Sequence, residues 1–433
     1  MNRSLRGAMT ILIATVMLWA FSGGTLPRAT ASGVGARAEA ACPGGSITID
    51  DFAPFSGPDA DYGAITQLPG AVAAVHFLNQ QGGVLGCRVK LIHTDSRGEP
   101  ADAVPALNQM VATTHNLALV IGPTGDEVES VSPILNRDHL VELNQAGDVT
   151  LDHLFMKYNY RLTQSDSLIA RAMGAAAILN GCRRGAMVFT SDVAGQGLVP
   201  SAIAAFKKGG GTVVANQPLQ QDQPSYRSVI LSLKAAHPQC IFTEEDERTA
   251  GTFFSQLKEL NFTNVKVYTT DELFPAWNKA VRNGAGASFL VHNIITLQGK
   301  VVHTPATSIF VHAFQEVYPG KQPYQLYNAQ TWDSIIVAAL AMTKAHSWHS
   351  PDYVNDISSI TNDVHGRKVY SYAPGMRLIK KGIPIQFIGA SGSLVFDRWH
   401  SIGGAYQIDH WTANGHAYPV RILSAALLRR FAP

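Results

Sequence analysis

Hydrophobic residues recur with two different periods along the chain, and the two periods alternate. Apolar residues occupy every second position of Ile47-Thr48-Ile49-Asp50, as in a half-buried strand. Over 68–78 they recur three and four residues apart, as on one face of a helix, and Gly82-Gly83 end that helix. This alternation of strand and helix continues to about residue 143 and begins again with a helix over 167–179. The pattern predicts α/β architecture with two similar, doubly wound lobes, each built on a parallel sheet covered by helices.

The turns that follow the predicted strands are the places to look for a binding site. In an open parallel sheet, ligands bind beyond the carboxyl ends of the strands, where helix N-termini point at them. The turns concerned span residues 54–63, 123–127, 144–150, 191–195, 244–248 and 270–274.

The first forty residues have the pattern of an export signal. Arg3 and Arg6 precede an uncharged apolar run over 10–21, which is shorter than the roughly 20 residues needed to span a bilayer. Small-x-small sites predict cleavage after Ala31, Ala38 or Ala40. We therefore expect a signal peptide over 1–40 and a mature protein in the periplasm or secreted.

Composition and charge exclude some classes of protein and of partner. Apolar residues make up 46% of the 433 residues and charged residues 15%, which excludes a disordered chain. Cleavage after Ala31 removes Arg3, Arg6 and Arg28 and leaves 31 basic against 32 acidic residues. Because no basic excess remains, a nucleic-acid partner is not expected.

Four cysteines in an exported chain point to two disulfides. Cys42 precedes the strand predicted over 46–52, and Cys87 opens the next strand, over 88–94. In the second half, Cys182 precedes the strand predicted over 186–190, and Cys240 opens the strand over 240–244. Parallel neighbouring strands bring such positions to one sheet edge, which predicts the pairs Cys42–Cys87 and Cys182–Cys240. Four buried free thiols are the alternative. A zinc site is disfavoured because no C-x-x-C pair occurs, and neither a metal nor a cofactor is expected.

Several short motifs occur in an order that resembles the branched-chain (Leu/Ile/Val) amino-acid-binding proteins of ABC importers, which have the type I periplasmic-binding fold. The resemblance covers about residues 45–415. It rests on Ala53-Pro54-Phe55-Ser56-Gly57-Pro58, Tyr62-Gly63, Gly82-Gly83-Val84-Leu85-Gly86, Val120-Ile121-Gly122-Pro123, Tyr160-Arg161-Leu162, Gly195-Gln196-Gly197-Leu198, Trp332-Asp333 and Gly392-Ser393-Leu394-Val395-Phe396-Asp397.

The resemblance implies a clamshell of two lobes joined by a three-strand hinge, with crossings near 160–165, 290–300 and 375–390. Lobe one would hold 42–161 and 298–380, lobe two 162–297 and 381–420, with a tail over 421–433. It also implies that a small molecule is captured between the lobes and delivered to ABC permease subunits by a monomer. A ligand-sensing domain that signals to a protein partner is the alternative.

The sequence departs from the family pattern at the ligand. Asp126 stands at about the position of the serine that holds the ligand carboxylate in the family, and Ala146-Gly147-Asp148 lacks the hydroxyl of the family's Ala-Thr turn. Ala194 replaces the family's second-lobe tyrosine. An ionised Asp126 would repel a ligand carboxylate. The ligand is therefore expected to be cationic, hydroxyl-rich or otherwise not a standard amino acid.

Two interpretations of the acidic turns stay open. In one, Asp126 and Glu127 cap a helix, and the run over 244–248 is a solvated rim in which Arg248 is paired locally. In the other, several carboxylates line the cleft and contact the ligand. The candidate ligand-binding residues are Phe55, Ser56, Tyr62, Thr124, Asp126, Glu127, Ala146, Gly147, Asp148, Asp192, Ala194, Glu244, Glu245 and Asp271.

Catalysis is not expected. The chain holds no nucleophile–base constellation, and Gly389-Ala390-Ser391-Gly392-Ser393 lacks the last glycine of a nucleophile elbow. His346 and His349 read as the end of a helix rather than as metal ligands. Trp332 falls on an apolar helix face and is expected in the core.

Overall fold

The computed structural model describes residue 42 and residues 45–57, 59–270, 275–300, 302–324 and 327–432. The predicted signal segment over 1–40 and the candidate Asp271 lie outside these residues. Within them, none of the helices combines the length and apolar character needed to cross a membrane.

The first lobe is built on a five-stranded parallel sheet with the order β2-β1-β3-β4-β5. Its β1 is buried along seven of eight positions, since helices cover both faces. The strands are β1 (Ser46–Ala53), β2 (Arg88–Asp95), β3 (Leu117–Ile121), β4 (Glu142–Asn144) and β5 (Asn159–Arg161).

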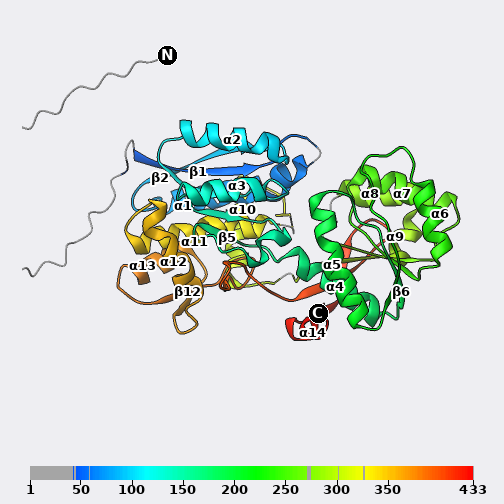
Figure 1. The fold of residues 1–433 in the computed structure, drawn as a ribbon. Coiled ribbons are helices and arrows are strands. Elements are labelled where there is room, and N and C mark those ends of the chain that lie inside the picture. The colour runs from blue at the N-terminus through cyan, green and yellow to red at the C-terminus, as the bar shows by residue number, and fades with distance from the viewer. Residues whose placement is uncertain are drawn as a thin grey trace, which may run out of the picture. The chain divides into compact units, whose positions relative to one another are not determined.

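Helices from two distant parts of the chain complete this lobe. One face packs against α2 and α3, and the other forms a core with α1, α10, α11 and α12, so blue and yellow segments share one body in Figure 1. The predicted core residue Trp332 is buried there. The helices are α1 (Leu68–Gln80), α2 (Pro100–Thr113), α3 (Val128–Arg137), α10 (Pro305–Val317), α11 (Asn328–Ala345), α12 (Ser350–Thr361) and α13 (Tyr372–Ile379), with the short turns η2 (Tyr62–Gln67) and η3 (Val149–His153).

The second lobe is built on a seven-stranded sheet with the order β14-β13-β10-β9-β8-β6-β7. The strands from β10 to β7 are parallel, whereas β13 and β14 are antiparallel additions at one edge. The strands are β6 (Arg184–Met187), β7 (Thr212–Asn216), β8 (Cys240–Phe242), β9 (Lys266–Thr270), β10 (Ile294–Gly299), β13 (Tyr406–Trp411) and β14 (Ala417–Leu423). The helices are α4 (Asp166–Leu179), α5 (Val193–Lys208), α6 (Arg227–Ala236), α7 (Glu247–Glu259), α8 (Pro275–Gly284), α9 (Ala287–Asn293) and α14 (Ala425–Arg429). The predicted two-lobed α/β architecture is confirmed.

Three segments cross between the lobes. The first links β5 to α4, the second links β10 to α10, and the third runs from Phe396 to β13. The first and third crossings lie side by side, since Arg161 forms a bridge with Ser401.

The third crossing comes later in the chain than the predicted 375–390. The strand β12 (Ile385–Phe387) pairs with β11 (Arg367–Val369), and Phe387 and Phe396 are buried in the first core. Residues 381–396 therefore pack with the first lobe rather than the second. At the C-terminus, β14 extends to Leu423, so the expected tail begins within a strand.

Both predicted disulfides are present. Cys42 is bonded to Cys87, and Cys182 to Cys240, one pair in each lobe. Their sequence separations are 45 and 58 residues, so each bond closes a long loop within a lobe.

Candidate functional site

The turn after β1 is held in place by the carboxylate of Asp95. The backbone amides of Phe55 and Ser56 donate to Asp95 Oδ1 at 2.9 and 3.3 Å, and the Ser56 hydroxyl donates to Oδ2 at 2.6 Å. The backbone approaches itself closely here, because a Cβ on Gly63 would lie 2.2 Å from the carbonyl oxygen of Pro54. Tyr62 then packs against an aromatic core of the second lobe. At this turn Phe55 and Tyr62 can form apolar walls of a binding site. The Ser56 hydroxyl already donates its proton to Asp95.

The turn after β3 carries the two acids of uncertain role. Neither caps α3 with its side chain: the N-cap residue is Glu127, and no side-chain cap hydrogen bond forms. No side-chain cap hydrogen bond therefore supports the capping interpretation at this helix. Glu127 is fully buried, and Oε1 accepts a hydrogen bond from Ser96 Oγ at 3.0 Å, while Oε2 has no partner among the described residues. Burial raises the pKa of Glu127 to about 7.

The turn after β4 is held by a buried arginine. Arg161 Nη1 donates to the carbonyl oxygens of Asp148 at 2.9 Å and Gly147 at 3.4 Å. The Asp148 side chain accepts from Thr150 N at 2.7 Å and so caps η3. Ala146 is fully buried in a small apolar cluster, which leaves the backbone of Gly147 and Asp148 as the polar part of the turn.

In the second lobe, two of the predicted residues, Asp192 and Ala194, lie at the start of α5. Asp192 caps α5 by accepting from Gly195 N at 2.7 Å, and its other oxygen accepts from Gln221 Nε2 at 2.6 Å. Ala194 follows in the first turn of α5 and supplies no polar group.

The acidic run over 244–248 is not one solvated rim. Glu245 is buried and accepts a hydrogen bond from Thr243, and Asp246 caps α7 through Arg248 N and Thr249 N. Arg248 forms its ion pair outside the run, with Asp222 at 2.7 Å. Glu244 is partly buried at the turn itself. The run therefore has separate structural roles at each position.

The acids of the two lobes face one another, and their charges act on each other across the cleft. The pKa of Asp126 is raised to about 7 by burial, followed by the charges of Asp192, Asp148, Asp59 and Glu99. Asp126 is only partly exposed, and the charges that act on it most strongly are all acidic. This region of facing turns is called the acidic cleft below.

Asp59, an acid outside the predicted set, also belongs to the acidic cleft. Burial raises the pKa of Asp59 to about 6, and the nearby charges of four acids contribute to the same shift, namely Glu99, Asp192, Asp246 and Glu247. The last three come from the second lobe. Asp59 was missed because it follows the quoted motif by one residue, although the sequence places it in the same turn.

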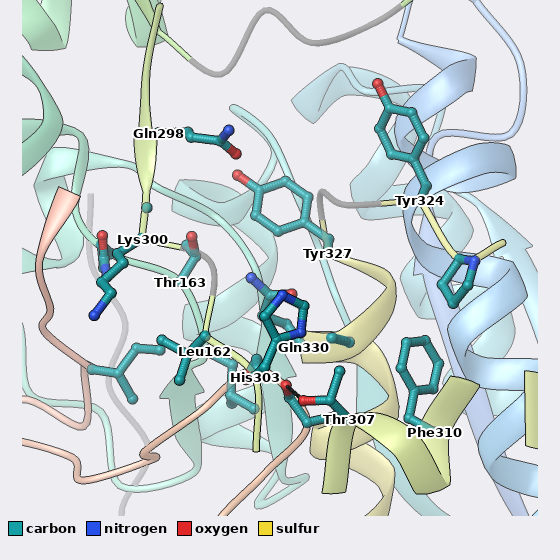
Figure 2. A pocket seen from close by; sticks show the side chains of 18 of the residues that line it. Leu162, Thr163, Gln298, Lys300, His303, Thr307, Phe310, Tyr324, Tyr327 and Gln330 are labelled. Atoms are coloured by element: carbon teal, nitrogen blue, oxygen red, sulfur yellow. Dashed lines mark hydrogen bonds between the residues drawn. The ribbon is translucent and has the colours of Figure 1, made fainter. Parts of the chain in front are cut away.

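The structure also contains a cavity that sequence reasoning did not predict. It has a volume of about 370 Å³ and is lined from all three crossings, by parts of 162–169, 298–307 and 390–406, and by the first turn of α11 (Figure 2). None of the thirteen predicted ligand residues that the structure describes lines it. This space is called the hinge cavity below. The predicted crossings at 160–165 and 290–300 were the signal that could have found it.

Comparisons with known proteins agree on the family. The family model described as "Periplasmic binding protein" matches residues 47–375. The "Leu/Ile/Val-binding protein homolog 3" of Brucella melitensis is 27% identical over 217 residues, which are 49% of this chain and 58% of that protein. An "Amino acid binding protein" of Pseudomonas aeruginosa is 21% identical over 56% of this chain and 64% of its own length. The chain thus spans about three fifths of the curated relatives that it matches.

Solved structures share the fold over nearly their whole length. The leucine-binding protein LivK of Thermotoga maritima aligns with a TM-score of 0.71 at 20% identity, covering 88% of this chain and 99% of that one. A solute-binding protein of an ABC transporter from R. palustris, in complex with benzoate, aligns with a TM-score of 0.69 at 15% identity, over 88% and 97%. At these identities the likeness establishes the fold alone.

Proposed function

The chain belongs to the periplasmic binding protein family, and from this premise we propose that it is an extracytoplasmic solute-binding protein of an ABC importer. It captures a small molecule between its two lobes and delivers it to the permease subunits, without a catalytic step. Ligand that contacts both lobes favours the closed arrangement by its differential affinity for the two states. The protein acts as an exported monomer.

The acidic cleft carries our proposal for the ligand. Burial raises the pKa values of Asp126 and Asp59 of the first lobe, and the charge of Asp192 of the second lobe raises both further. A ligand with ammonium groups would relieve this repulsion, and one rich in hydroxyls could donate to these carboxylates. We infer that the ligand is cationic or hydroxyl-rich rather than a branched-chain amino acid.

The groups that would hold an amino-acid carboxylate do not favour one here. Asp126 occupies the turn where the family serine stands, and the Ala146–Asp148 turn offers no hydroxyl of its own. A ligand carboxylate placed at Asp126 would meet a group with the same charge in a partly desolvated site. Ala194 leaves room where a tyrosine would stand, which suits a ligand larger than leucine.

A thermal-shift screen tests the proposal directly. The mature protein, stripped of ligand by unfolding and refolding, is screened against amino acids, amines, amides, polyols and aromatic acids. A ligand at 100 times its dissociation constant stabilises the protein by about 2.7 kcal/mol, a rise of roughly 5–10 °C for a lobe of this size. A shift with amines or polyols is expected. A shift confined to leucine, isoleucine and valine would contradict the proposed ligand class while leaving the transport role intact.

Matched variants then locate the site. Asp126→Asn removes a cleft charge without removing a helix cap, and Asp192→Asn keeps a residue type that caps helices well. Each should weaken binding of a cationic hit by about tenfold, since charge-assisted hydrogen bonds contribute roughly 1.5–3 kcal/mol. Glu129→Gln, an exposed change on α3, is the control and should leave affinity unchanged. Equal affinity for all three variants would place the site elsewhere.

A further inference from the structure

The hinge cavity is large enough for a small organic molecule, and it adjoins the acidic cleft where Asp166 of its lining lies against Gly147. Its volume of about 370 Å³ falls in the range of about 300–1,000 Å³ that is typical of ligand pockets. Its described lining shares no residue with the turns that carry Asp126, Asp148 or Asp192. A molecule bound here would therefore contact other residues than those three acids.

The polar side chains at the hinge cavity favour an anionic group. Lys300 and His303 line it from the second crossing (Figure 2), and both residues are exposed. Neither forms an ion pair in the part of the chain that the structure describes. Gln330 adds an amide from α11. An ammonium, an imidazole and an amide N–H are donors suited to a carboxylate.

One acid lines the described part of the hinge cavity, and its carboxylate lies toward another segment. Asp166 opens α4, and its Oδ1 is so close to the turn after β4 that a Cβ on Gly147 would lie 2.0 Å away. The charge of Asp166 is thus directed to the cleft side of the hinge. The cavity therefore differs in charge from the acidic cleft, which has several carboxylates and favours cations.

The remaining lining is apolar and would take the body of the ligand. Leu162 and Ile169 contribute from the first crossing and α4, Phe310 from α10 and Ile402 from the third crossing. Phe310 is 2% exposed and belongs to the first-lobe core, so this wall is rigid. A ring or a branched chain fits such a surface by burying apolar area.

Gln164 shows how closely the hinge cavity depends on the arrangement of the crossings. A Cβ on Gly404 of the third crossing would lie 2.1 Å from Gln164 Nε2, and one on Gly299 of the second would lie 3.2 Å from Oε1. The Gln164 side chain from the first crossing is therefore enclosed by the other two, and its Oε1 is buried with no hydrogen-bond partner among the described residues. Movement of any crossing changes the cavity.

We propose that the hinge cavity is a second binding site, which takes a small carboxylate with an apolar body and thereby biases the hinge. Because all three crossings line the site, such a ligand binds the open and closed arrangements with different affinity, and this difference is transmitted to cargo binding. The inference does not depend on the identity of the cargo.

The test uses benzoate as the probe and benzamide as its uncharged analogue. Calorimetric titration of the mature protein is expected to show one benzoate site, with benzamide at least about tenfold weaker because it lacks the charge paired with Lys300. Lys300→Met and His303→Gln alter exposed residues, so both variants should fold and should weaken benzoate by roughly tenfold. Lys279→Met, at an exposed lysine of α8, is the matched control and should bind like the unaltered chain.

Three outcomes would overturn the proposal. The first is no heat of binding at benzoate concentrations up to about 10 mM. The second is benzoate binding that Lys300→Met and His303→Gln leave unchanged, which would place the probe outside the hinge cavity. The third is loss of benzoate binding in Asp126→Asn alone, which would place it in the acidic cleft. Because benzoate is the probe, these three measurements stay informative even if the thermal-shift screen identifies no cargo.

Discussion

Replacing Arg161 with methionine is expected to destabilise the hinge because it removes a buried charge with many partners. The Arg161 side chain is 3% exposed, and its Nη2 lies 2.8 Å from Asp152 Oδ1. Its Nε donates to Ser401 Oγ at 3.1 Å on the third crossing, and its Nη1 holds the turn after β4 through two carbonyl oxygens. One guanidinium thus connects the first crossing, the third crossing and the turn after β4.

The size of the effect follows from what remains after the change. Removing one partner of a buried ion pair costs about 3–5 kcal/mol, chiefly because the other charge stays buried without compensation. Asp152 keeps hydrogen bonds from Ser165 Oγ and Ser167 Oγ at 2.7 and 2.6 Å, so we expect the lower end, about 3 kcal/mol. For a lobe of this size this corresponds to a fall in Tm of roughly 6–12 °C.

Urea unfolding and calorimetry of Arg161→Met measure this loss, and the chain offers a matched control. Arg137 Nε lies at the same 2.8 Å from Asp138 Oδ1, but its side chain is 68% exposed. Arg137→Met should therefore cost less than about 1 kcal/mol. Adding Asp152→Asn to Arg161→Met should recover part of the loss, because it removes the uncompensated charge. If Arg161→Met and Arg137→Met change the free energy of unfolding equally, the ion pair at the hinge is not the source of stability that the reasoning requires.

Three further predictions concern pH and the disulfides. Burial raises the pKa values of Glu142 and Asp333 to about 7, above their unfolded values near 4. Because the native state therefore binds more protons, the free energy of unfolding should fall as pH rises from about 4 to 7. A Tm at pH 7.5 equal to or above that at pH 5.5 would contradict this. Affinity for a cationic ligand should instead decline as pH falls below about 7, because Asp126 then becomes protonated. Binding titrations at pH 6 and 8 check this, and Asp126→Asn is expected to flatten the pH profile. Replacing both Cys182 and Cys240 with alanine opens a loop of 58 residues and should cost about 2–5 kcal/mol, measured by urea unfolding, and an unchanged midpoint would refute a stabilising role.

The sequence alone was sufficient for the architecture and for both disulfides. Strands such as Ser46–Ala53 and helices such as Leu68–Gln80 are recognisable because periods of 2 and 3.6 residues reflect which face is buried, a property of neighbouring residues. The disulfide pairs followed because parallel strands that are neighbours in a sheet bring their starting positions to one edge.

Tertiary structure decided the roles of the residues within those turns. No side-chain cap forms at the helix that follows Asp126, and the pKa of Asp126 is raised by burial and then by acids from both lobes. The contacts of Arg161 reach Ser401, 240 residues away, and the hinge cavity exists only where three distant segments meet. The third crossing lies beyond 381–396 because β12 pairs back onto β11. Local periodicity carries no information about such contacts, because desolvation and charge at a site are set by whichever distant groups the fold brings there.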